Sequence, residues 1–283
     1  MRQIVVISGK GGTGKTVIAA SFAALAKNKV MADCDVDAAD LHLLLHPSIK
    51  ETHEFRGGKT AVIDKNKCNE CGKCTEVCRF DAIEDFVVDP ISCEGCGVCF
   101  HICPEGAIDM REDLSGEWFI SETKYGPFVH AKLAIAEENS GKLVTIVRQN
   151  AKSIAADEGR DFVIIDGPPG IGCSVIASLA GVDLALVVTE PTLSGIYDME
   201  RVISVAQHFG IRTYVCINKY DLNFKNTQTI REYCQDSNIE LAGEIPFDTK
   251  VTEALVNGKS IIEYQDGELS CQISNLWDKV KGG

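Results

Sequence analysis

The sequence alternates short, β-branched apolar runs with stretches in which apolar residues recur at helical spacing. This alternation is typical of a mostly parallel sheet covered by helices on both faces, so we predict an α/β fold. The predicted strands are Ile4–Ile7, Lys29–Ala32, Leu143–Val147, Phe162–Ile165, Leu184–Val188, Thr213–Ile217 and Leu241–Ile245. The predicted helices are Val17–Ala26, Val175–Ala180, Ser194–His208 and Asn226–Asp236. Ligands of such sheets bind at the carboxyl ends of the strands.

Residues from about 58 to 115 interrupt this alternation. They contain eight of the 13 cysteines and lie between Gly57-Gly58 and Ser115-Gly116. We therefore predict an inserted domain over 59–115, within a host domain formed by 1–58 and 116–283. Because the host pattern resumes afterwards, the insert is expected to leave and re-enter the host at neighbouring points.

Composition and charge narrow the choice of compartment and partner. A chain of 283 residues with 45% hydrophobic and 24% charged residues can bury a sizeable core without disulfides, so the cysteines need another explanation. The net charge of −13 disfavours nucleic acid and stable membrane association. No apolar run approaches the roughly 18 residues that span a bilayer or forms a signal peptide. We expect a cytoplasmic protein, where clustered cysteines bind metal.

A glycine-rich loop follows the first predicted strand and directly precedes the first predicted helix. Its residues are Gly9, Lys10, Gly11, Gly12, Thr13, Gly14, Lys15 and Thr16, which fit the pattern G-x-x-x-x-G-K-[ST]. The backbone N–H groups of such a loop surround phosphates, Lys15 reaches the β and γ phosphates, and the Thr16 hydroxyl binds Mg²⁺. The sequence therefore predicts a phosphate-binding loop for a nucleoside triphosphate.

The second lysine of this loop makes the run K-G-G-T-G-K-T, which resembles the deviant Walker A loop of the MinD and ParA superfamily. The resemblance implies a homodimer that forms on ATP binding, with Lys10 crossing the interface to act on the partner's nucleotide. The Asp33-Cys34-Asp35 segment is similar to the switch I segment of that superfamily. By this resemblance Asp35 orients the attacking water and Asp33 lies near Mg²⁺.

Two further segments carry the same resemblance. The apolar strand Phe162–Ile165 ends in Asp166, as a Walker B strand does, and Asp166 is expected to hold Mg²⁺ through water. The run Asn218–Asp221 is similar to the N-K-x-D motif that binds guanine, but the superfamily uses an asparagine here for adenine. The predicted base-binding residues are Asn218, Pro246 and Phe247, and the resemblance favours ATP over GTP.

The inserted segment carries two runs of four cysteines with the doubled spacing of bacterial ferredoxins. In this spacing the fourth cysteine of each run crosses to the other [4Fe–4S] cluster. The predicted ligands are Cys68, Cys71, Cys74 and Cys103 for the first cluster, and Cys93, Cys96, Cys99 and Cys78 for the second. Zinc is the alternative, although two four-cysteine runs have no natural division into tetrahedral sites.

The surroundings of these cysteines add two expectations. Residues 64–113 contain twelve acidic and five basic residues, a local net charge of −7, which suits a basic redox partner. Arg79 stands where the ferredoxin pattern has the proline that the second run keeps as Pro104. A cation there is expected to favour the reduced form of the second cluster.

The rest of the chain carries weaker signals. The other cysteines are Cys34, Cys173, Cys216, Cys234 and Cys271. We interpret them as small buried hydrophobic residues, with a dimer-bridging cluster at the first three as the alternative. Glu137–Lys142 is interpreted as a turn, or as a loop that contacts the switches or a partner. Leu276–Lys281 is interpreted as the docked end of a helix rather than a membrane-targeting segment.

Both sets of motifs together predict a nucleotide-dependent, dimerising ATPase coupled to a 2[4Fe–4S] module. Its partner is expected to be a redox protein or a protein of metallocluster assembly. One alternative is a redox-sensing nucleotide-binding scaffold with negligible turnover. Another is a protein that performs electron transfer alone.

Overall fold

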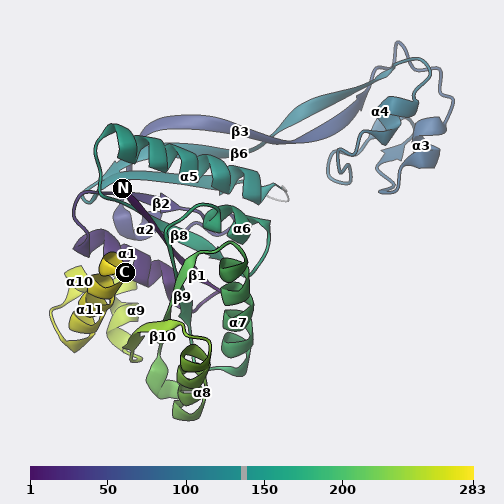
Figure 1. Cartoon of the computed structure of the whole chain (residues 1–283). Coiled ribbons are helices and arrows are strands. Elements are labelled where there is room, and N and C mark those ends of the chain that lie inside the picture. Colours follow the sequence, from purple (N-terminus) through teal and green to yellow (C-terminus); the bar gives the residue numbers. More distant parts are fainter. Residues whose placement is uncertain (135–138) are drawn as a thin grey trace. The chain divides into compact units, whose positions relative to one another are not determined.

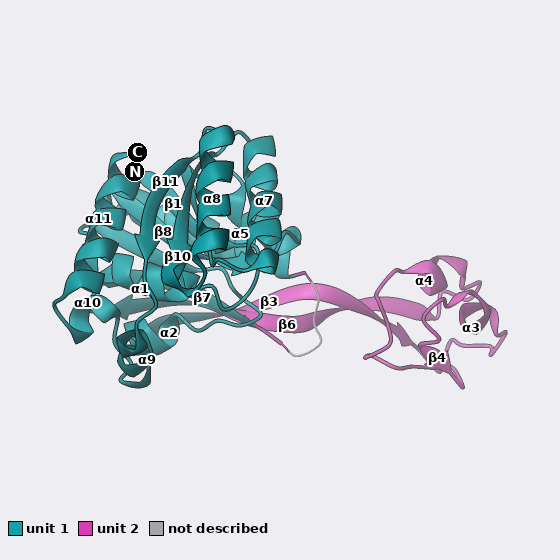
Figure 2. Cartoon of the chain, turned by 90° about the horizontal axis from the view of Figure 1, so that it is seen from below, with its two compact units in different colours: residues 1–52, 118–132, 140–283 teal, residues 53–117, 133–139 magenta. Residues whose placement is uncertain are grey.

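The computed structural model describes residues 1–134 and 139–283 of the chain (Figure 1). The chain divides into two units, coloured separately in Figure 2. Unit 1 comprises Met1–Thr52, Trp118–Lys132 and Ser140–Gly283, and unit 2 comprises His53–Glu117 and Leu133–Asn139. The predicted insert, 59–115, falls within unit 2.

The main sheet has nine strands in the order β11-β10-β9-β1-β8-β2-β7-β6-β3. The strands are β1 (Arg2–Ser8), β2 (Lys29–Asp33), β3 (Ser48–Ile63), β6 (Ile108–Thr123), β7 (Gly126–Leu133), β8 (Phe162–Pro169), β9 (Leu184–Thr189), β10 (Arg212–Asn218) and β11 (Glu240–Ile245). Neighbouring strands from β11 to β7 pair in parallel. The predicted α/β fold with a mostly parallel sheet is confirmed.

The helices of unit 1 cover both faces of this sheet. They are α1 (Lys15–Leu25), α2 (His42–Leu45), α5 (Ser140–Asp157), α6 (Cys173–Leu179), α7 (Leu193–His208), α8 (Phe224–Asp236), α9 (Thr249–Val256), α10 (Ile261–Tyr264) and α11 (Glu268–Gly282), with a 3₁₀ turn η1 at Tyr220–Leu222. Figure 1 shows α1 and α11 on one face and α5 to α8 on the other. The Trp277 ring of α11 packs against Phe22 and Phe162, with ring centroids 5.0 and 5.4 Å away. The prediction of a docked C-terminal helix end is therefore confirmed.

The strand predicted at Leu143–Val147 is wrong, because these residues lie inside helix α5. The run is apolar and β-branched, and a short run of this kind fits a buried strand as well as a buried helix. The buried positions of α5 include Leu143, Val147, Ala151 and Ala155, which recur every four residues along one helical face. That longer periodicity was the signal for a helix.

Strands β3, β6 and β7 had no counterpart in the sequence prediction. β3 contains long runs of exposed polar residues, so it lacks the apolar alternation that indicates a half-buried strand. β6 and β7 are joined by the two-residue turn Lys124-Tyr125. In the stretch predicted as a turn, Glu137 and Glu138 lie outside the described residues, and Ser140–Lys142 begin helix α5.

Unit 2 contains short elements around a small core. The Gly57 and Gly58 amides donate to Ser115 Oγ at 3.2 and 3.1 Å, so the predicted flanks of the insert lie side by side. The helices are α3 (Lys73–Val77) and α4 (Val98–Ile102), and β4 (Ile83–Glu84) pairs with β5 (Val87–Val88) in antiparallel orientation. The buried core consists of Ala61, Cys74, Ile83, Cys99 and Ile108. Two cysteines thus replace ordinary hydrophobic residues in this core.

Candidate functional site

The phosphate-binding loop joins a fully buried strand to a buried helix. Residues Ile4–Ile7 of β1 are completely buried, and helix α1 begins at Lys15. Gly14 has φ 93°, and a Cβ atom at this position would lie 2.4 Å from Asn218 Nδ2. A Cβ atom on Gly9 would lie 2.4 Å from Asp198 of α7. Close approach of β10 and α7 therefore requires glycine at both positions.

Three carboxylates converge beside this loop. Asp33 and Asp166 are register partners at the carboxyl ends of the parallel strands β2 and β8. Asp35 follows β2, and its Oδ2 atom lies 2.7 Å from Lys15 Nζ. The Asp33 Oδ1 atom accepts a hydrogen bond of 3.0 Å from the Asp35 amide. The sheet therefore brings together the four charged residues Lys15, Asp33, Asp35 and Asp166.

Burial controls the ionisation of these groups. Burial raises the pKa of Asp166 to about 6, although Lys15 and the Thr16 hydroxyl oppose the rise. Burial, together with the charge of Asp166, raises the pKa of Asp33 well above its usual range. Burial lowers the pKa of Lys15, but the charges of Asp166 and Asp35 outweigh it and the net shift is upward. A cation bound here would relieve the repulsion among the carboxylates.

The Asp166 Oδ1 atom is buried and has no hydrogen-bond partner among the described residues. An unpartnered carboxylate oxygen in the interior is costly unless a ligand satisfies it. Magnesium prefers carboxylate and hydroxyl oxygens as ligands. The donor set of Thr16, Asp33 and Asp166 therefore fits Mg²⁺.

A cavity of about 620 Å³ in unit 1 extends from the loop to the loop after β11. It is lined by residues that include Gly12, Lys15, Asp35, Asn218, Pro246 and Phe247. Asn218 Nδ2 donates to the Thr13 carbonyl oxygen at 2.8 Å, which ties the end of β10 to the phosphate loop. The Asp221 Oδ1 atom accepts a hydrogen bond of 2.7 Å from the Phe247 amide. The structure thus places all three predicted base-binding residues on one cavity.

Lys10 lies outside the residues that line this cavity. Its Nζ atom lies 2.5 Å from Glu190 Oε1 and donates to the hydroxyls of Thr192 and Ser194 at 3.2 and 3.3 Å. Glu190 also pairs with Lys219 Nζ at 3.3 Å. Sequence reasoning missed Glu190, although its position directly after β9, at a carboxyl strand end, was a usable signal.

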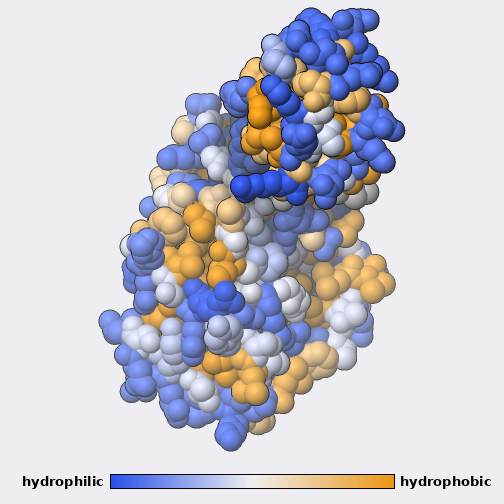
Figure 3. All heavy atoms as spheres, turned by 90° about the vertical axis from the view of Figure 1, so that its right-hand side faces the viewer, coloured by the Kyte–Doolittle hydropathy of each residue, from blue (hydrophilic) through white to orange (hydrophobic). Residues whose placement is uncertain are grey.

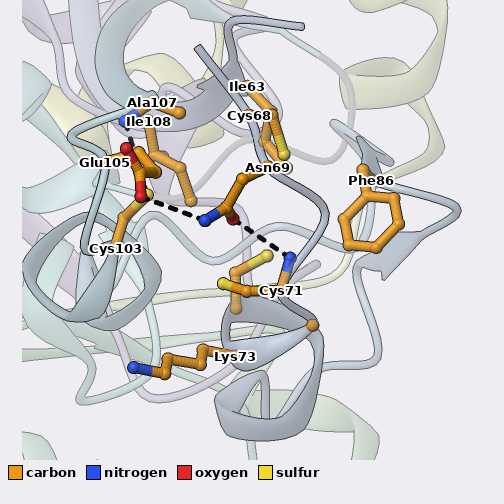
Figure 4. Close-up of a pocket in the computed structure, with 12 residues that line it drawn as sticks. Ile63, Cys68, Asn69, Cys71, Lys73, Phe86, Cys103, Glu105, Ala107 and Ile108 are labelled. Atoms are coloured by element: carbon orange, nitrogen blue, oxygen red, sulfur yellow. Dashed lines mark hydrogen bonds between the residues drawn. The ribbon is translucent and has the colours of Figure 1, made fainter.

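Two further cavities lie in unit 2, and four cysteines line each of them. The first cavity is lined by Cys68, Cys71, Cys74 and Cys103 (Figure 4). The second is lined by Cys78, Cys93, Cys96 and Cys99. The fourth cysteine of each run thus lies with the first three of the other run. All eight thiols are free.

The four cysteines of each set line one cavity. Across residues 1–134 and 139–283, no three His, Cys, Asp or Glu side chains converge closely enough to hold one metal ion. Four cysteine thiolates are the ligands that a cubane iron–sulfur cluster takes. The residue types and their grouping therefore fit two [4Fe–4S] clusters.

The remaining cysteines divide into two groups. Cys34, Cys216 and Cys234 are buried, and burial raises the pKa of each thiol. Cys173 and Cys271 are exposed, so the interpretation of all five as buried hydrophobic residues is wrong for these two. Both exposed residues lie on helices, where their neighbours on the other face provide the packing.

Comparison with known proteins adds three findings. Residues 4–261 match the family model of the CobQ/CobB/MinD/ParA nucleotide binding domain. An uncharacterized protein of Methanocaldococcus jannaschii is 37% identical over 283 residues, which cover 99% of this chain and 96% of that protein. The cytosolic Fe-S cluster assembly factor NBP35 of Eremothecium gossypii is 23% identical over 154 residues, 48% of this chain and 46% of that protein.

Among solved structures, the septum site-determining protein MinD of Pyrococcus horikoshii, complexed with Mg-ADP, superimposes with a TM-score of 0.61. The match covers 99% of this chain and 95% of that chain at 18% identity. At this identity the likeness shows a shared fold. Among the described residues, no helix is both long enough and apolar enough to cross a membrane.

Proposed function

The chain belongs to the CobQ/CobB/MinD/ParA nucleotide-binding family, and from that premise we propose that it is an ATP-dependent dimerising ATPase coupled to two [4Fe–4S] clusters. One observation carries this proposal. A single chain holds a phosphate-loop cavity with buried carboxylates and two cavities that are each lined by four cysteines. The coupled protein acts with a redox or metallocluster-assembly partner.

The nucleotide lies in the 620 Å³ cavity with its phosphates on the loop and its base between Asn218 and Phe247. Mg²⁺, when held by Thr16, Asp33 and Asp166, neutralises charge on the phosphates. The Mg-ADP complex of the MinD protein of P. horikoshii, which has the same fold, supports this assignment. Asp221 Oδ1 accepts a hydrogen bond from the Phe247 amide, so one oxygen of the carboxylate that would pair with guanine is already engaged, and this favours adenine.

Lys15 and Asp35 bind each other before the nucleotide binds and bind other groups afterwards, during the cycle of nucleotide binding and hydrolysis. In the structure, Lys15 Nζ is 2.7 Å from Asp35 Oδ2. Phosphate oxygens compete for the same ammonium group, so nucleotide binding releases Asp35. The freed carboxylate then orients the attacking water, and Lys15 stabilises charge on the phosphoryl group.

Lys10 acts on the nucleotide of the partner subunit. Within one chain it is bound to Glu190, which directly follows β9, and it does not line the cavity of its own subunit. A cation supplied across a dimer interface stabilises the charge that develops on the transferred phosphoryl group. Hydrolysis therefore depends on the dimer.

The two cysteine-lined cavities hold one cluster each, with crossed fourth ligands. The similarity to a protein named as an Fe-S cluster assembly factor supports iron–sulfur chemistry in this family. Each cluster with four thiolates is negatively charged, and this adds to the local charge of −7 over residues 64–113. A partner with a basic surface is therefore expected.

The test is anaerobic purification, metal and sulfide analysis, and ATP hydrolysis measured with oxidised and with reduced clusters. We expect about eight Fe and eight sulfide per chain, and an ATPase rate that changes with redox state. Stoichiometric zinc without sulfide would refute the cluster assignment. Cys103→Ser should remove the first cluster although Cys103 lies in the second run.

A mixing experiment tests the dimer. Lys10→Ala chains are mixed with an excess of Asp35→Ala chains, and hydrolysis is measured. Partial recovery is expected, because one heterodimer site combines an intact Asp35 with Lys10 from the other chain. No recovery, with heterodimers shown to form, would contradict action in trans.

A redox-sensing scaffold with negligible turnover is the second candidate. One observation favours it: Lys15 and Lys10 are both engaged by carboxylates of their own chain, those of Asp35 and Glu190. In that case nucleotide affinity, but not turnover, responds to the redox state. A hydrolysis rate near zero in both redox states, with unequal affinities, would favour the scaffold.

A further inference from the structure

The two cysteine cavities are related by a repeat along the sequence. Each position of the first run has its counterpart 25 residues later, as Cys68 and Cys93 or Cys78 and Cys103 show. Helices α3 and α4 occupy matching places in this repeat. Any difference between the two cavities must therefore come from the residues that are not cysteine.

The side chains that line the two cavities differ in polarity. Lys73 lines the first cavity, and its counterpart Val98 lines the second. Glu105 lines the first, and its counterpart Phe80 lines the second. The first cavity thus carries one cation and one anion, whereas apolar side chains replace both in the second.

A third pair continues the difference. Asn69 Nδ2 donates to Glu105 Oε1 at 3.0 Å, and Asn69 Oδ1 accepts from the Cys71 amide at 3.2 Å (Figure 4). Its counterpart Glu94 lines the second cavity and adds a negative charge there. In the first cavity, the Glu105 carboxylate is therefore satisfied by a hydrogen bond. In the second cavity, Glu94 is the only charged side chain among the described residues that line it.

Backbone amides also distinguish the two sets. The Glu70 amide donates to Cys68 Sγ at 3.4 Å, and the Ala107 amide donates to Cys103 Sγ at 3.3 Å. The sulfurs of the counterparts, Cys93 and Cys78, accept no such bond within the described parts of the chain.

The difference at Cys78 has a cause in the sequence. After Cys103, Pro104 begins a tight turn in which the Gly106 amide donates to the Cys103 carbonyl oxygen at 3.3 Å. This turn aims the Ala107 amide at the sulfur. Arg79 replaces the proline after Cys78, and the structure places it outside the residues that line the second cavity. The effect expected of Arg79 on the second cluster therefore stays a prediction.

Hydrogen bonds to cluster sulfurs and nearby positive charge stabilise the reduced, more negative form of an iron–sulfur cluster. A nearby carboxylate and an apolar surrounding have the opposite effect. We propose that Lys73, together with the Glu70 and Ala107 amides, gives the first cluster a higher reduction potential than the second. The first cluster is the one held by the first cysteine set, Cys68, Cys71, Cys74 and Cys103. A single electron then resides at the first set. This inference rests on the proposed presence of both clusters.

Both cavities have exposed lining residues, which include charged ones in the first (Lys73 and Glu105) and apolar ones in the second. In the second cavity, Phe80 and Val98 are 42% and 47% exposed. Figure 3 shows hydrophobic residues interspersed with hydrophilic ones on the side of the molecule that it draws. An electron that enters at the second set moves on to the first. The direction of transfer follows from the difference in potential.

The test is an anaerobic redox titration of the full-length protein, followed by electron paramagnetic resonance. We expect two one-electron steps whose reduction equilibrium constants differ at least tenfold, which is 59 mV for one electron. Lys73→Val should lower the equilibrium constant for the step at higher potential, reduction of the first cluster, by about threefold. This is the scale of a partly exposed charge interaction. Val98→Lys should raise the equilibrium constant for the step at lower potential, reduction of the second cluster, by a similar factor.

Matched variants separate the proposal from general effects. Lys73→Gln, which removes the charge and keeps a long side chain, should reproduce the shift if Lys73→Val fails to incorporate iron. Lys65→Val removes an exposed lysine that lines neither cavity, and both steps should stay unchanged. Equal potentials in the unaltered protein, or a Lys73 variant that moves the lower step, would overturn the inference. Lack of iron and sulfide would instead refute the proposed function.

Discussion

Units 1 and 2 hold their functional residues in different ways. In unit 1 a large core of sheet and helix residues, among them Phe22 and Trp277, surrounds the nucleotide cavity. The charged residues of the cavity already have protein partners, such as Lys15 with Asp35. In unit 2 the helices have five residues each, and the buried core has five residues, two of which are cysteines.

This difference indicates which unit can fold without its ligand. A core that surrounds a ready-made site provides hydrophobic stabilisation whether or not nucleotide is bound. A core of five residues is far below what an independent domain needs, and such small domains usually depend on metals or disulfides. Metal binding then supplies folding free energy. We therefore expect unit 1 to be organised before its ligand binds, and we expect unit 2 to depend on the proposed clusters.

The largest expected effect comes from removal of iron. Chelation under reducing conditions should abolish amide protection in unit 2, because the cysteine-lined cavities collapse without clusters. Unit 1 should keep its protection and its ATP affinity. Hydrogen exchange measured by mass spectrometry, with and without chelator, checks both statements. Retained protection in unit 2 would contradict the proposed dependence on clusters.

Lys15→Ala should affect unit 1 alone. ATP affinity should fall about 100-fold, on the order of 3 kcal/mol, because charge-assisted hydrogen bonds to phosphate are lost. Iron content should stay unchanged. Isothermal titration with a non-hydrolysable ATP analogue gives the affinity.

Lys10→Ala is the matched control for the Lys15 variant, because it removes a lysine from the same loop. It should leave affinity within a factor of about three, since exposed ion pairs contribute little. A similar loss of affinity in both variants would argue against a role for Lys10 across the dimer interface. Circular dichroism confirms that both variants are folded.

The pH dependence of unit 1 should report on His130 in β7. Burial, with the neighbouring His42, lowers the pKa of His130 to about 4, and the ring stacks on Phe119 and Phe128. The unfolded chain binds a proton near pH 6.5 and the folded chain does not, so stability is lost as pH falls from about 6.5 to 4. The loss should reach about 3 kcal/mol at most.

Denaturant unfolding followed by tryptophan fluorescence measures this effect in unit 1, which contains both tryptophans, Trp118 and Trp277. His130→Phe should flatten the pH dependence over this range. His101→Phe changes an exposed histidine of unit 2 and should leave the slope unaltered. An unchanged slope in His130→Phe would assign the pH dependence to another group.

The smallest effect is expected for a buried cysteine of unit 1. Cys216 is fully buried in β10, and it packs as a small hydrophobic residue. Cys216→Val should cost less than about 1.5 kcal/mol of stability and leave iron content and ATP affinity unchanged. Thermal unfolding and iron analysis check this. A loss of iron would place Cys216 among the cluster ligands. Unit 1 would then also hold a cluster ligand, and the two units would no longer differ in this respect.

Much of the fold could be predicted because parallel strands buried on both faces are continuous apolar runs. Strands β1, β2, β8, β9 and β10 all have such runs. The edge strand β11 has a weaker pattern, with Ala242 and Ile245 as its buried residues. The polar strand β3 could not be recognised, because its pairing with β6 leaves most of its side chains in water. Helix α5 was mistaken for a strand because a five-residue window could not distinguish the two periods.

Local spacing determined the chemistry of the site. The order of glycine, lysine and threonine in residues 9–16 and the intervals between cysteines are properties of the chain itself, and each requires only a few neighbouring residues to act together. Tertiary structure decided which distant residues meet. It aligned Asp33 with Asp166 and paired Lys10 with Glu190. It also brought Glu105, from the second cysteine run, to the first cavity, where Asn69 Nδ2 donates to it. Side chains that approach from separate segments depend on packing rather than on spacing in the sequence.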